Sequence, residues 1–399
     1  MSTTIEPSDS SGPRPPAQEG TPFSVLAVGG LYRDVLIKVP SFPAEDAKQS
    51  AISETSRVGG NISNTLSVLS QVVAPNTQLL YATVVGGPEP IWRPLIFTLE
   101  AKGITMLYEI RQGEGMLTPT AYIFESQKTG SRTIISHQLI PGLKTSEVLS
   151  LLFTHFFPKN TFLSNAYDDM LSRVYNAHSS FYPSWIHFEG RECFMVEGVI
   201  DHFTGRKEYK TNPCTISVEF EMYGRPGLDR LVGMCDVAFI AENYMKAYLE
   251  DTRKGSWDEE DKEEMVRFFA DLTKRTVKRK ATMFVTVGAD GAYLLQFRNG
   301  SVEITHFPAP DIDSSDIIET TGAGDTFVGA VIYALGYKRF DPVKATRVAV
   351  NVASRKCMQV GYDTLGNVED GFGSLESDDI SRPEEDASAA PVRPSDGLL

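Results

Sequence analysis

The chain has 399 residues, of which 41% are apolar, 23% charged and 10% aromatic. This composition is sufficient for a packed core and excludes a wholly disordered chain. The formal net charge is −14, but residues 1–21 carry −2 and residues 366–399 carry −7, which leaves −5 for the residues between them. This mildly acidic body argues against nucleic acid or an anionic membrane as the main partner.

The two ends of the chain differ in composition from the rest. Residues 1–21 are rich in Ser, Pro, Thr and Gly, and residues 366–399 in Asp, Glu, Ser and Pro. Neither segment can bury enough apolar surface to offset its ordering entropy, so both are predicted to be disordered tails. The acidic C-terminal tail is either a solvated end or a docking or phosphorylated segment. Glu6, Asp9 and the lack of an apolar stretch argue against a signal peptide at the N-terminus.

The cysteines and the longest apolar stretch bear on the compartment. The four cysteines are Cys193, Cys214, Cys235 and Cys357. No two of them have the C-x-x-C spacing that zinc or dithiol chemistry needs. The longest apolar stretch, around Phe327–Leu335, is far shorter than the roughly 20 residues of a membrane span. We therefore expect a cytoplasmic protein with reduced thiols and no membrane segment.

Between the tails, short β-like runs alternate with helical ones, a pattern typical of an α/β fold with a mostly parallel sheet. The strand candidates are apolar runs bounded by glycine or polar residues: Phe23–Val28, Trp185–Phe188, Thr215–Phe220, Val237–Ile240 and Met283–Val287. Thr65–Val73 follows a glycine pair and is predicted to be helical.

Another helix is predicted after Ser256. Ser256 and Glu259 form a capping-box pattern, and apolar residues from Met265 to Leu272 follow at helical spacing. Basic residues gather at 274–280. They are either the solvated end of this helix, where cations suit the negative pole, or a nuclear-import or polyanion patch.

Two early segments alternate apolar and polar residues, as in an antiparallel sheet with one solvated face. They are Leu31–Val58 and Thr118–His137. Together they are predicted to form a small β-sheet lid, from about 31–58 and 118–138, over a site on the main sheet.

The most informative segment is Glu-Thr-Thr-Gly-Ala-Gly-Asp at 319–325. Gly322 and Gly324 permit a tight turn, and an apolar run at helical spacing follows. Such a turn presents free N–H groups at a helix N-terminus, where an anion binds. Asp325 in the first helical turn either stabilises the helix or removes a proton from an attacking hydroxyl beside that anion.

The segment Thr321–Asp325, followed by Thr-Phe and small apolar residues, resembles the second signature of the ribokinase-like (PfkB) carbohydrate kinase family, and Gly59–Asn64 resembles the first. Further similar segments lie in the family's order over residues 22–365: 28–34, 42–46, 130–134, 185–191, 217–219 and 356–363. Within the family the chain is most similar to the ketohexokinase branch, the fructokinases that make fructose 1-phosphate. The resemblance implies a three-layer ribokinase-like sandwich with a mostly parallel central sheet and a small β-sheet lid.

The resemblance also implies roles at the site of phosphoryl transfer. Asp325 would be the general base, and the amides of Gly322, Ala323 and Gly324 would form the anion hole. Arg132 on the second lid segment would face the γ-phosphate. Phosphoryl transfer depends mainly on positioning and charge stabilisation, so these residues would suffice alongside ATP and Mg²⁺.

Sugar hydroxyls and the nucleotide would be held by two further groups of residues. Fixed donors and acceptors can discriminate hydroxyl stereochemistry, and those implied for the sugar are Asp34, Asp46, Gly60, Asn61 and Asn64. Those implied for the nucleotide are Gly288 and Gly291 in the loop 287–291, Phe307, Pro308, Asn351 and Ala353.

The chain departs from the family pattern at several positions. Glu319 stands where the family usually has Asp, which leaves a monovalent-cation site for K⁺ open. The Asn-x-x-Glu motif linked to Mg²⁺ is not met at residues 241–245, where Glu242 is a partial substitute, so no metal ligand is assigned. The stretch 142–184 is longer than expected. His187 is predicted to be a core residue rather than a catalyst, and Glu189 to contact water near the sugar.

The sequence contains no motif of three other common classes of enzyme. There is no P-loop sequence, no H-E-x-x-H and no G-x-S-x-G. The sequence therefore predicts an ATP-dependent sugar kinase that acts on fructose, with a ribokinase or nucleoside kinase as the nearest alternative. An alternative of another class is a non-catalytic sugar- or nucleotide-binding regulator that recruits partners through its tail. By analogy with the family, a homodimer through the lid is expected.

Overall fold

The computed structural model describes residues 23–156, 182–206, 209–210, 213–252, 261–278 and 280–366. The predicted tails at 1–21 and 366–399 lie outside these ranges, apart from Gly366. The capping box at Ser256 and Glu259, residue 279 of the basic cluster and residues 157–181 of the long stretch also lie outside them.

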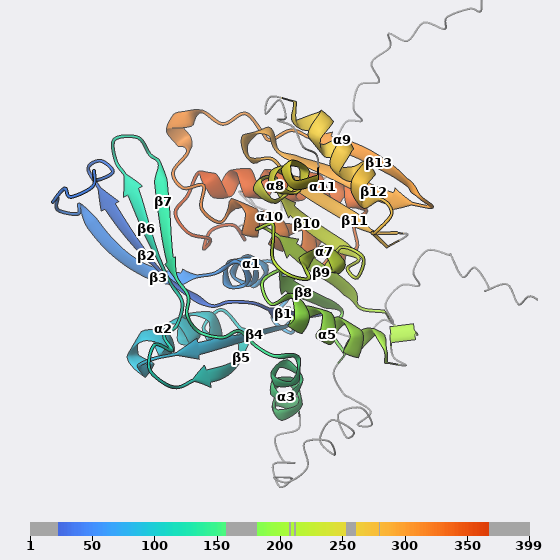
Figure 1. The fold of residues 1–399 in the computed structure, drawn as a ribbon, viewed down its shortest axis with the longest axis horizontal. Coiled ribbons are helices and arrows are strands. Elements are labelled where there is room, and N and C mark those ends of the chain that lie inside the picture. The colour runs from blue at the N-terminus through green and yellow to red at the C-terminus, as the bar shows by residue number, and fades with distance from the viewer. Residues whose placement is uncertain are drawn as a thin grey trace, which may run out of the picture.

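The main sheet has nine strands in the order β13-β12-β11-β10-β9-β8-β1-β4-β5 (Figure 1). Their bounds are β1 Ser24–Val28, β4 Gln78–Gly86, β5 Ile104–Arg111, β8 Trp185–Glu189, β9 Thr215–Phe220, β10 Val237–Ala241, β11 Thr282–Thr286, β12 Ala292–Arg298 and β13 Ser301–Phe307. The β11–β12 and β12–β13 pairs are antiparallel, and all other pairs are parallel. The prediction of a mostly parallel α/β sheet is confirmed, and the five predicted strands lie within a residue of their observed bounds.

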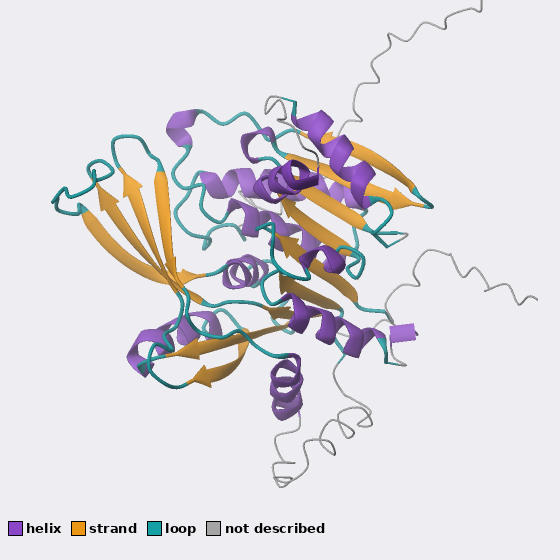
Figure 2. Ribbon diagram, viewed as in Figure 1, coloured by secondary structure: helices purple, strands orange, loops and turns teal. Residues whose placement is uncertain are grey.

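Helices cover both faces of this sheet, which gives the three layers (Figure 2). One apolar core joins the sheet to α3 (Thr145–Phe156), α5 (Cys193–Thr204), α7 (Leu228–Leu231), α8 (Glu242–Thr252) and α9 (Lys262–Thr273). The other core joins it to α1 (Asn61–Leu69), α2 (Glu89–Glu100), α10 (Ala323–Val331) and α11 (Pro342–Cys357). Every residue of β1, β8 and β9 is buried, which explains why these strands are nearly continuous apolar runs.

The lid is a separate sheet of four strands in the order β3-β2-β6-β7. The strands are β2 Tyr32–Val39, β3 Ser53–Gly59, β6 Thr120–Ser126 and β7 Arg132–His137. The prediction that the two early segments join in one small sheet is confirmed, but the expectation of a purely antiparallel sheet is wrong. The central β2–β6 pair is parallel. The reason is that β2 follows β1 and β6 follows β5, and these two strands of the main sheet run in the same direction. Each of β2 and β6 then pairs with its own antiparallel partner, β3 or β7.

Two predicted helices begin at other residues than expected. Helix α1 begins at Asn61 rather than Thr65 and ends at Leu69, because Gly60, with φ 98°, turns the chain directly into the helix. Helix α9 begins at Lys262, and the Asp261 side chain caps it by accepting a hydrogen bond from Glu264 N at 2.9 Å. All four cysteines are free. Within the described ranges, no helix combines the length and apolar character that crossing a membrane would require.

Candidate active site

The glycine turn and helix N-terminus predicted around Gly322 are present. Gly322 is the N-cap of α10 and has φ 81°, a left-handed conformation that favours glycine. A Cβ at this position would lie 1.9 Å from the Tyr362 hydroxyl oxygen. The Thr326 hydroxyl donates to Gly322 O at 2.8 Å and secures the start of the helix. The turn therefore requires glycine for both its backbone conformation and its contact with Tyr362.

The free amides of this turn differ from the predicted set. Ala323 N donates to Thr320 O at 3.2 Å and is not free. For Gly324 N and Asp325 N, no acceptor occurs among the described residues, as expected in the first turn of a helix. Gly324 is exposed, and a Cβ added there would meet no atom within 4 Å. The available anion donors are thus the amides of Gly324 and Asp325, at the positive pole of α10.

Asp325 lies in a cleft and is not walled off from solvent. Its Oδ2 accepts a hydrogen bond from Asn64 Nδ2 at 2.7 Å, and its backbone oxygen accepts one from Thr65 Oγ1 at 3.2 Å. Both donors lie on α1, which packs against α10. The cleft has a volume of about 140 Å³. Its walls are formed by Asn61, Glu219, Phe220, Glu221, Phe239, Ile240, Ala241, Thr286, Gly324, Asp325, Phe327 and Val328.

The surroundings of Asp325 favour its protonated form. Burial and the negative charge of Glu219 raise the pKa of Asp325 well above its ordinary value, although the hydrogen bond from Asn64 acts in the opposite direction. A carboxyl group with a raised pKa beside free amides can accept a proton from a hydroxyl and hold it.

Glu219 on β9 is a second carboxyl group in the same cleft. Its Oε2 accepts a hydrogen bond from Asn61 Nδ2 at 2.7 Å, and its Oε1 lies 2.8 Å from His187 Nε2. Burial raises the pKa of Glu219 to about 8, against the effect of the Asn61 hydrogen bond. His187 is fully buried, its Nδ1 lies 2.8 Å from Ser217 Oγ, and burial lowers the pKa of its imidazole to about 3. His187 is thus a neutral core residue that fixes Glu219.

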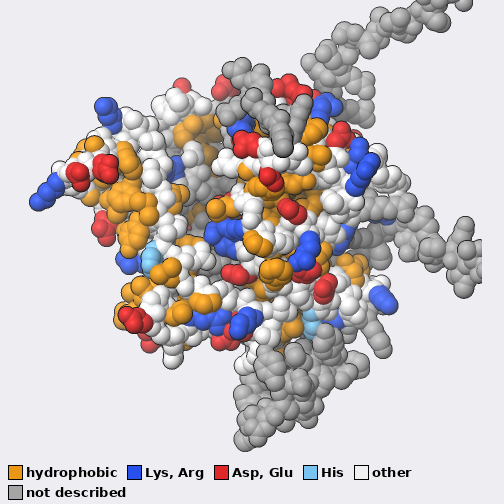
Figure 3. Space-filling model, viewed as in Figure 1, with side chains coloured by type: hydrophobic (Ala, Val, Ile, Leu, Met, Phe, Trp, Pro, Cys, Tyr) orange, Lys and Arg blue, Asp and Glu red, His pale blue; other side chains and the backbone are white. Residues whose placement is uncertain are grey.

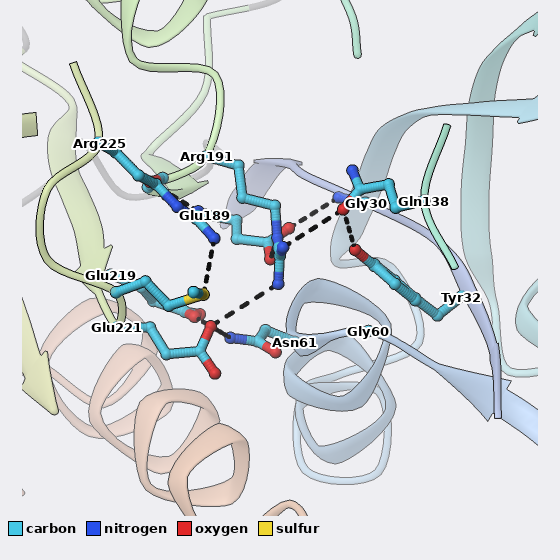
Figure 4. Close-up of polar contacts among 12 residues, drawn as sticks. Gly30, Tyr32, Gly60, Asn61, Gln138, Glu189, Arg191, Glu219, Glu221 and Arg225 are labelled. Atoms are coloured by element: carbon cyan, nitrogen blue, oxygen red, sulfur yellow. Dashed lines mark hydrogen bonds and ion pairs between the residues drawn. The ribbon is translucent and has the colours of Figure 1, made fainter. Parts of the chain in front are cut away.

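A network of charged side chains continues the wall of the cleft (Figure 4). Glu189 at the end of β8 accepts hydrogen bonds from Gly30 N at 2.8 Å and from Arg191 Nε. The Arg191 guanidinium also lies 3.8 Å from Glu221 and 5.5 Å from the ring centroid of Tyr32. Figure 4 shows Asn61 of α1, Glu219 of β9 and Glu221, which directly follows β9, facing this network. The cleft is therefore lined by carboxylates that a cation or sugar hydroxyls can engage.

The residues implied for the sugar are only partly brought together. Asn61 and Asn64 on α1 face the cleft, and Gly60 caps that helix. Asp34 on β2 is buried against Gly59, and burial raises the pKa of its carboxyl to about 6 despite the charge of Arg57. Asp46 lies exposed in the connection between β2 and β3. The eight residues of β2 span about 26 Å, so Asp46 lies at the other end of the lid.

Arg132 brings the lid into contact with the glycine turn. It is the first residue of β7. Its Nη2 donates to the Thr320 hydroxyl at 2.6 Å. The guanidinium thus lies beside the segment that leads into the free amides, where phosphate oxygens would bind.

The residues implied for the nucleotide follow β11 and β13. Gly288 begins a short 3₁₀ turn, Gly288–Asp290, and one residue separates it from the end of β11 at Thr286. A Cβ on Gly291 would lie 2.1 Å from Phe307 O, so the two segments touch at this glycine. The Phe307 side chain is buried in the core and Pro308 is exposed. Asn351 and Ala353 are half-buried on α11, which packs against β12 and β13.

Glu319 directly precedes the glycine turn and is held by cations. Its Oε1 accepts a hydrogen bond from Arg57 at 2.6 Å, and its Oε2 accepts from Lys356 at 3.0 Å and from Gly361 N at 2.9 Å. Burial opposes its ionisation, but the hydrogen bonds from Arg57, Gly361 N and Lys356 and the charge of Arg57 outweigh burial and lower the pKa of Glu319 to about 2.

The donor set fits magnesium carried by a nucleotide. Nowhere in the part of the chain that is described do three His, Cys, Asp or Glu side chains gather as a metal site. Mg²⁺ does not require such a cage, because it commonly keeps waters and substrate phosphates with one or two carboxylates. Glu219 and Glu221 line the Asp325 cleft and offer the hard oxygen atoms that Mg²⁺ prefers.

Sequence reasoning assigned no role to several residues of the site. These are Arg57, Glu219, Glu221, Lys356 and Tyr362. For Glu219 a signal was available. It is the one charged residue in the otherwise apolar and hydroxyl-bearing strand Thr215–Phe220, and ligands of α/β proteins bind at the carboxyl ends of such strands. Arg57, Lys356 and Tyr362 act through contacts between distant segments, which no local pattern reveals.

Comparisons with known proteins agree with this geometry. Residues 219–366, which include Glu219 and the glycine turn, match the family described as pfkB family carbohydrate kinase. Mouse ketohexokinase is 25% identical over 348 residues, which cover 86% of this chain and 98% of that protein.

Solved structures share the fold at lower sequence identity. Ribokinase from Giardia lamblia superposes with a TM-score of 0.63 at 16% identity, covering 89% of this chain and 97% of that one. Arabidopsis thaliana ribokinase complexed with ribose and ATP superposes with a TM-score of 0.59 at 18% identity, covering 86% of this chain and 94% of that one. Taken with the glycine turn, the Asp325 cleft and the four-stranded lid, these matches show that the chain has the ribokinase-like fold and is similar to pfkB family carbohydrate kinases over residues 219–366.

Proposed function

We propose that this protein is a sugar kinase that transfers the γ-phosphoryl group of ATP to fructose and forms fructose 1-phosphate. The observation that carries the proposal is the Asp325 carboxyl, which lines a cleft beside the unpaired amides of Gly324 and Asp325. The choice of fructose is supported by the similarity to mouse ketohexokinase along 98% of that protein.

In the proposed reaction, Asp325 is the general base. Asn64 holds Oδ2, which leaves Oδ1 to accept the proton of the acceptor hydroxyl. The hydroxyl oxygen forms a bond to the γ-phosphorus, the bond between that phosphorus and the bridging oxygen breaks, and ADP leaves. The amides at the start of α10 stabilise the charge on the transferring group, which is the main requirement of this chemistry.

Further residues bind the two substrates in this proposal. Asn61, Asn64, Gly60 and Asp34 bind sugar hydroxyls from α1 and β2. Asp46 is left out, because it is exposed at the other end of the lid. Arg132 binds phosphate oxygens from the lid. When bound with ATP, Mg²⁺ neutralises phosphate charge, and Glu219 and Glu221 are the residues that would hold it.

The nucleotide base would lie near residues 288–291, in this proposal, and against α11. The support is that Thr286, at the end of β11, borders the Asp325 cleft, and that Gly288 follows two residues later. Gly291, Pro308, Asn351 and Ala353 complete this side. Phe307 contributes through its backbone, since its ring is packed in the core.

The test is ADP release measured across fructose, ribose, other sugars and nucleosides. We expect fructose to give the highest kcat/KM. The Asp325→Asn variant should bind ATP as the parent does and lose turnover by about 10² to 10⁴-fold, the usual contribution of a general base. Asp271→Asn, on the exposed face of α9, is the matched control and should keep full activity.

Three outcomes would contradict parts of this proposal. Absence of turnover on fructose with turnover on ribose or a nucleoside would reassign the acceptor. Equal activity of Asp325→Asn and the parent would remove Asp325 from the mechanism. Sugar or nucleotide binding without any turnover in the parent would favour a regulator over an enzyme.

The exposed lid supports a homodimer as the assembled form. Figure 3 shows hydrophobic side chains gathered over the lid. On its strands Ile134 and Ile135 are 55% and 57% exposed, and Tyr122 is 41% exposed. Light scattering should give twice the monomer mass for the parent, and Ile135→Glu should give the monomer. A monomeric parent would contradict the dimer.

The free cysteines support the cytoplasm as the proposed compartment.

A further inference from the structure

Lys356, near the end of α11, has a fully enclosed ammonium group. Its side chain has no solvent exposure. Nζ lies 3.0 Å from Glu319 Oε2, 3.1 Å from Glu319 O and 3.4 Å from Gln359 O. The ring centroid of Tyr362 lies 5.5 Å from Nζ. Two carbonyls, one carboxylate and one aromatic face therefore surround a buried positive charge, as a desolvated cation requires.

The ammonium group contacts two segments next to the glycine turn, one before the turn and one after α11. Glu319 directly precedes the turn at 320–322, and Gln359 lies in the loop that follows α11. Gly361 N in this loop donates to Glu319 Oε2 at 2.9 Å. The same loop places the Tyr362 hydroxyl against Gly322. Lys356 thus holds the turn, whose helix provides the free amides, against α11 and its loop.

The residues around Glu319 do not fit a free monovalent cation. Glu319 O, Glu319 Oε2 and Gln359 O already contact Lys356 Nζ, and Arg57 contacts the other carboxylate oxygen of Glu319 at 2.6 Å. Two positive groups therefore share one carboxylate. A K⁺ ion that shared these oxygens would lie close to Nζ and would be repelled by its positive charge.

We infer that the Lys356 ammonium is the built-in monovalent cation of the phosphoryl-binding turn, so that neither stability nor turnover depends on K⁺. Because the cation is covalently tethered, it needs no binding step and cannot dissociate. Lys356 touches no reacting atom, so it is a positioning residue that acts through Glu319. The kinetic part of this inference rests on the proposed function, whereas the part on cation binding does not.

The first test uses the parent protein. Initial rates and melting temperatures are compared in potassium chloride and choline chloride at equal ionic strength, and crystals are soaked in Rb⁺ or Tl⁺ for anomalous diffraction. We expect equal rates, equal melting temperatures and no anomalous peak near Glu319 O. A rate or melting temperature raised specifically by K⁺, or a peak at that position, would overturn the inference.

The second test removes the Lys356 ammonium group by substitution. In choline, Lys356→Ala should lower kcat/KM on the order of 10²-fold, the scale of a misplaced catalytic element. K⁺ or NH₄⁺ should enter the vacated space and raise the kcat/KM of this variant about tenfold. Lys356→Met fills the space with a neutral chain and should lose the same activity without rescue. Lys102→Ala, which breaks the exposed pair with Asp363, should behave as the parent in both salts.

The outcomes separate this inference from the proposed function. Unchanged activity of Lys356→Ala, or a loss that no small cation rescues, would mean that Lys356 forms only a structural ion pair. If Lys356→Ala does not fold, the salt comparison and anomalous diffraction of the parent still decide the matter. If the parent phosphorylates no sugar, the proposed function fails, and the melting temperatures and diffraction still test cation binding.

Discussion

Glu319 and Asp325 lie on either side of the same glycine turn, yet their surroundings are opposite. Glu319 accepts hydrogen bonds from Arg57, Lys356 and Gly361 N, which together lower its pKa to about 2 despite burial. Asp325 is half-buried in a cleft that Glu219 also lines, and among the described side chains its carboxyl accepts a hydrogen bond from the neutral amide of Asn64, so that its pKa is raised well above 3.8. One carboxylate stays ionised and holds the turn, while the other can exchange a proton.

The comparison teaches that neighbours, and not residue type, assign these roles. A carboxylate whose partners are cations gains stability from its charge, so it belongs to the framework. A carboxyl group buried beside another carboxyl group is destabilised by its charge and gains from taking up a proton. The turn at 320–322 separates these two environments.

Removal of Glu319 is expected to have the largest effect. Glu319→Gln leaves the buried Lys356 ammonium and Arg57 without a countercharge, so the free energy of unfolding should fall by about 3 kcal/mol or more. Urea denaturation near neutral pH measures this change. Glu263→Gln breaks the exposed pair with Arg267 and should cost less than about 1 kcal/mol. Similar losses in the two variants would show that the Glu319 cluster is not a framework element.

Alanine substitutions at two glycines of the turn should change the free energy of unfolding in opposite directions. Gly322→Ala places a Cβ in a left-handed residue and 1.9 Å from Tyr362, so the free energy of unfolding should fall by at least about 1–2 kcal/mol. Gly324 is helical and a Cβ there meets nothing, so Gly324→Ala should raise stability by about 0.4–1 kcal/mol. The new methyl group should nevertheless lower kcat by crowding the phosphoryl group. Full activity of Gly324→Ala would show that its amide does not face the transferring group.

Substitution of Glu219 is expected to change stability in the opposite direction, because this carboxyl group is destabilised by its charge in the folded chain. Its carboxyl ionises near 8 in the folded chain and near 4.5 when unfolded. The native state therefore binds the proton more tightly, and its stability falls as the pH rises from 4.5 to 8. Glu219→Gln removes this titration and should be more stable than the parent above pH 8. Parallel stability–pH curves for the two proteins would contradict the raised pKa.

Glu319 should show the opposite dependence on pH. Its folded pKa of about 2 lies below the unfolded value of 4.5. Its contribution to stability is therefore complete above pH 4.5 and is lost as the pH falls toward 2. Acid denaturation of the parent and Glu319→Gln should converge over this range. A constant difference between them down to pH 2 would contradict the account.

The sequence was sufficient for the elements whose signals are local. The apolar runs that became β1 and β8 to β11, the glycine turn at Gly322 and the position of Asp325 in the first helical turn could all be predicted. So could the joining of two distant segments in a lid. The parallel β2–β6 pair could not, because alternation of apolar and polar residues fixes the faces of a strand and not the direction of its neighbour.

The parts of the site that were missed depend on contacts over long sequence separations. Arg57 and Lys356 meet only at Glu319, and Tyr362 lies against Gly322 because the loop after α11 returns to the turn. Ala323 N was expected to be free, and its bond to Thr320 O depends on the turn's actual geometry. Asp46 was grouped with the sugar residues by its motif, whereas the length of β2 carries it to the other end of the lid.

The pH dependence of kcat/KM in the parent tests most directly whether the carboxyl beside the free amides accepts the proton of the acceptor. Only ionised Asp325 can accept that proton, so kcat/KM should decline on the acidic side with a midpoint well above 3.8, the ordinary value for aspartate. A kcat/KM that stays constant from neutral pH down to that value, in protein that remains folded, would contradict the account.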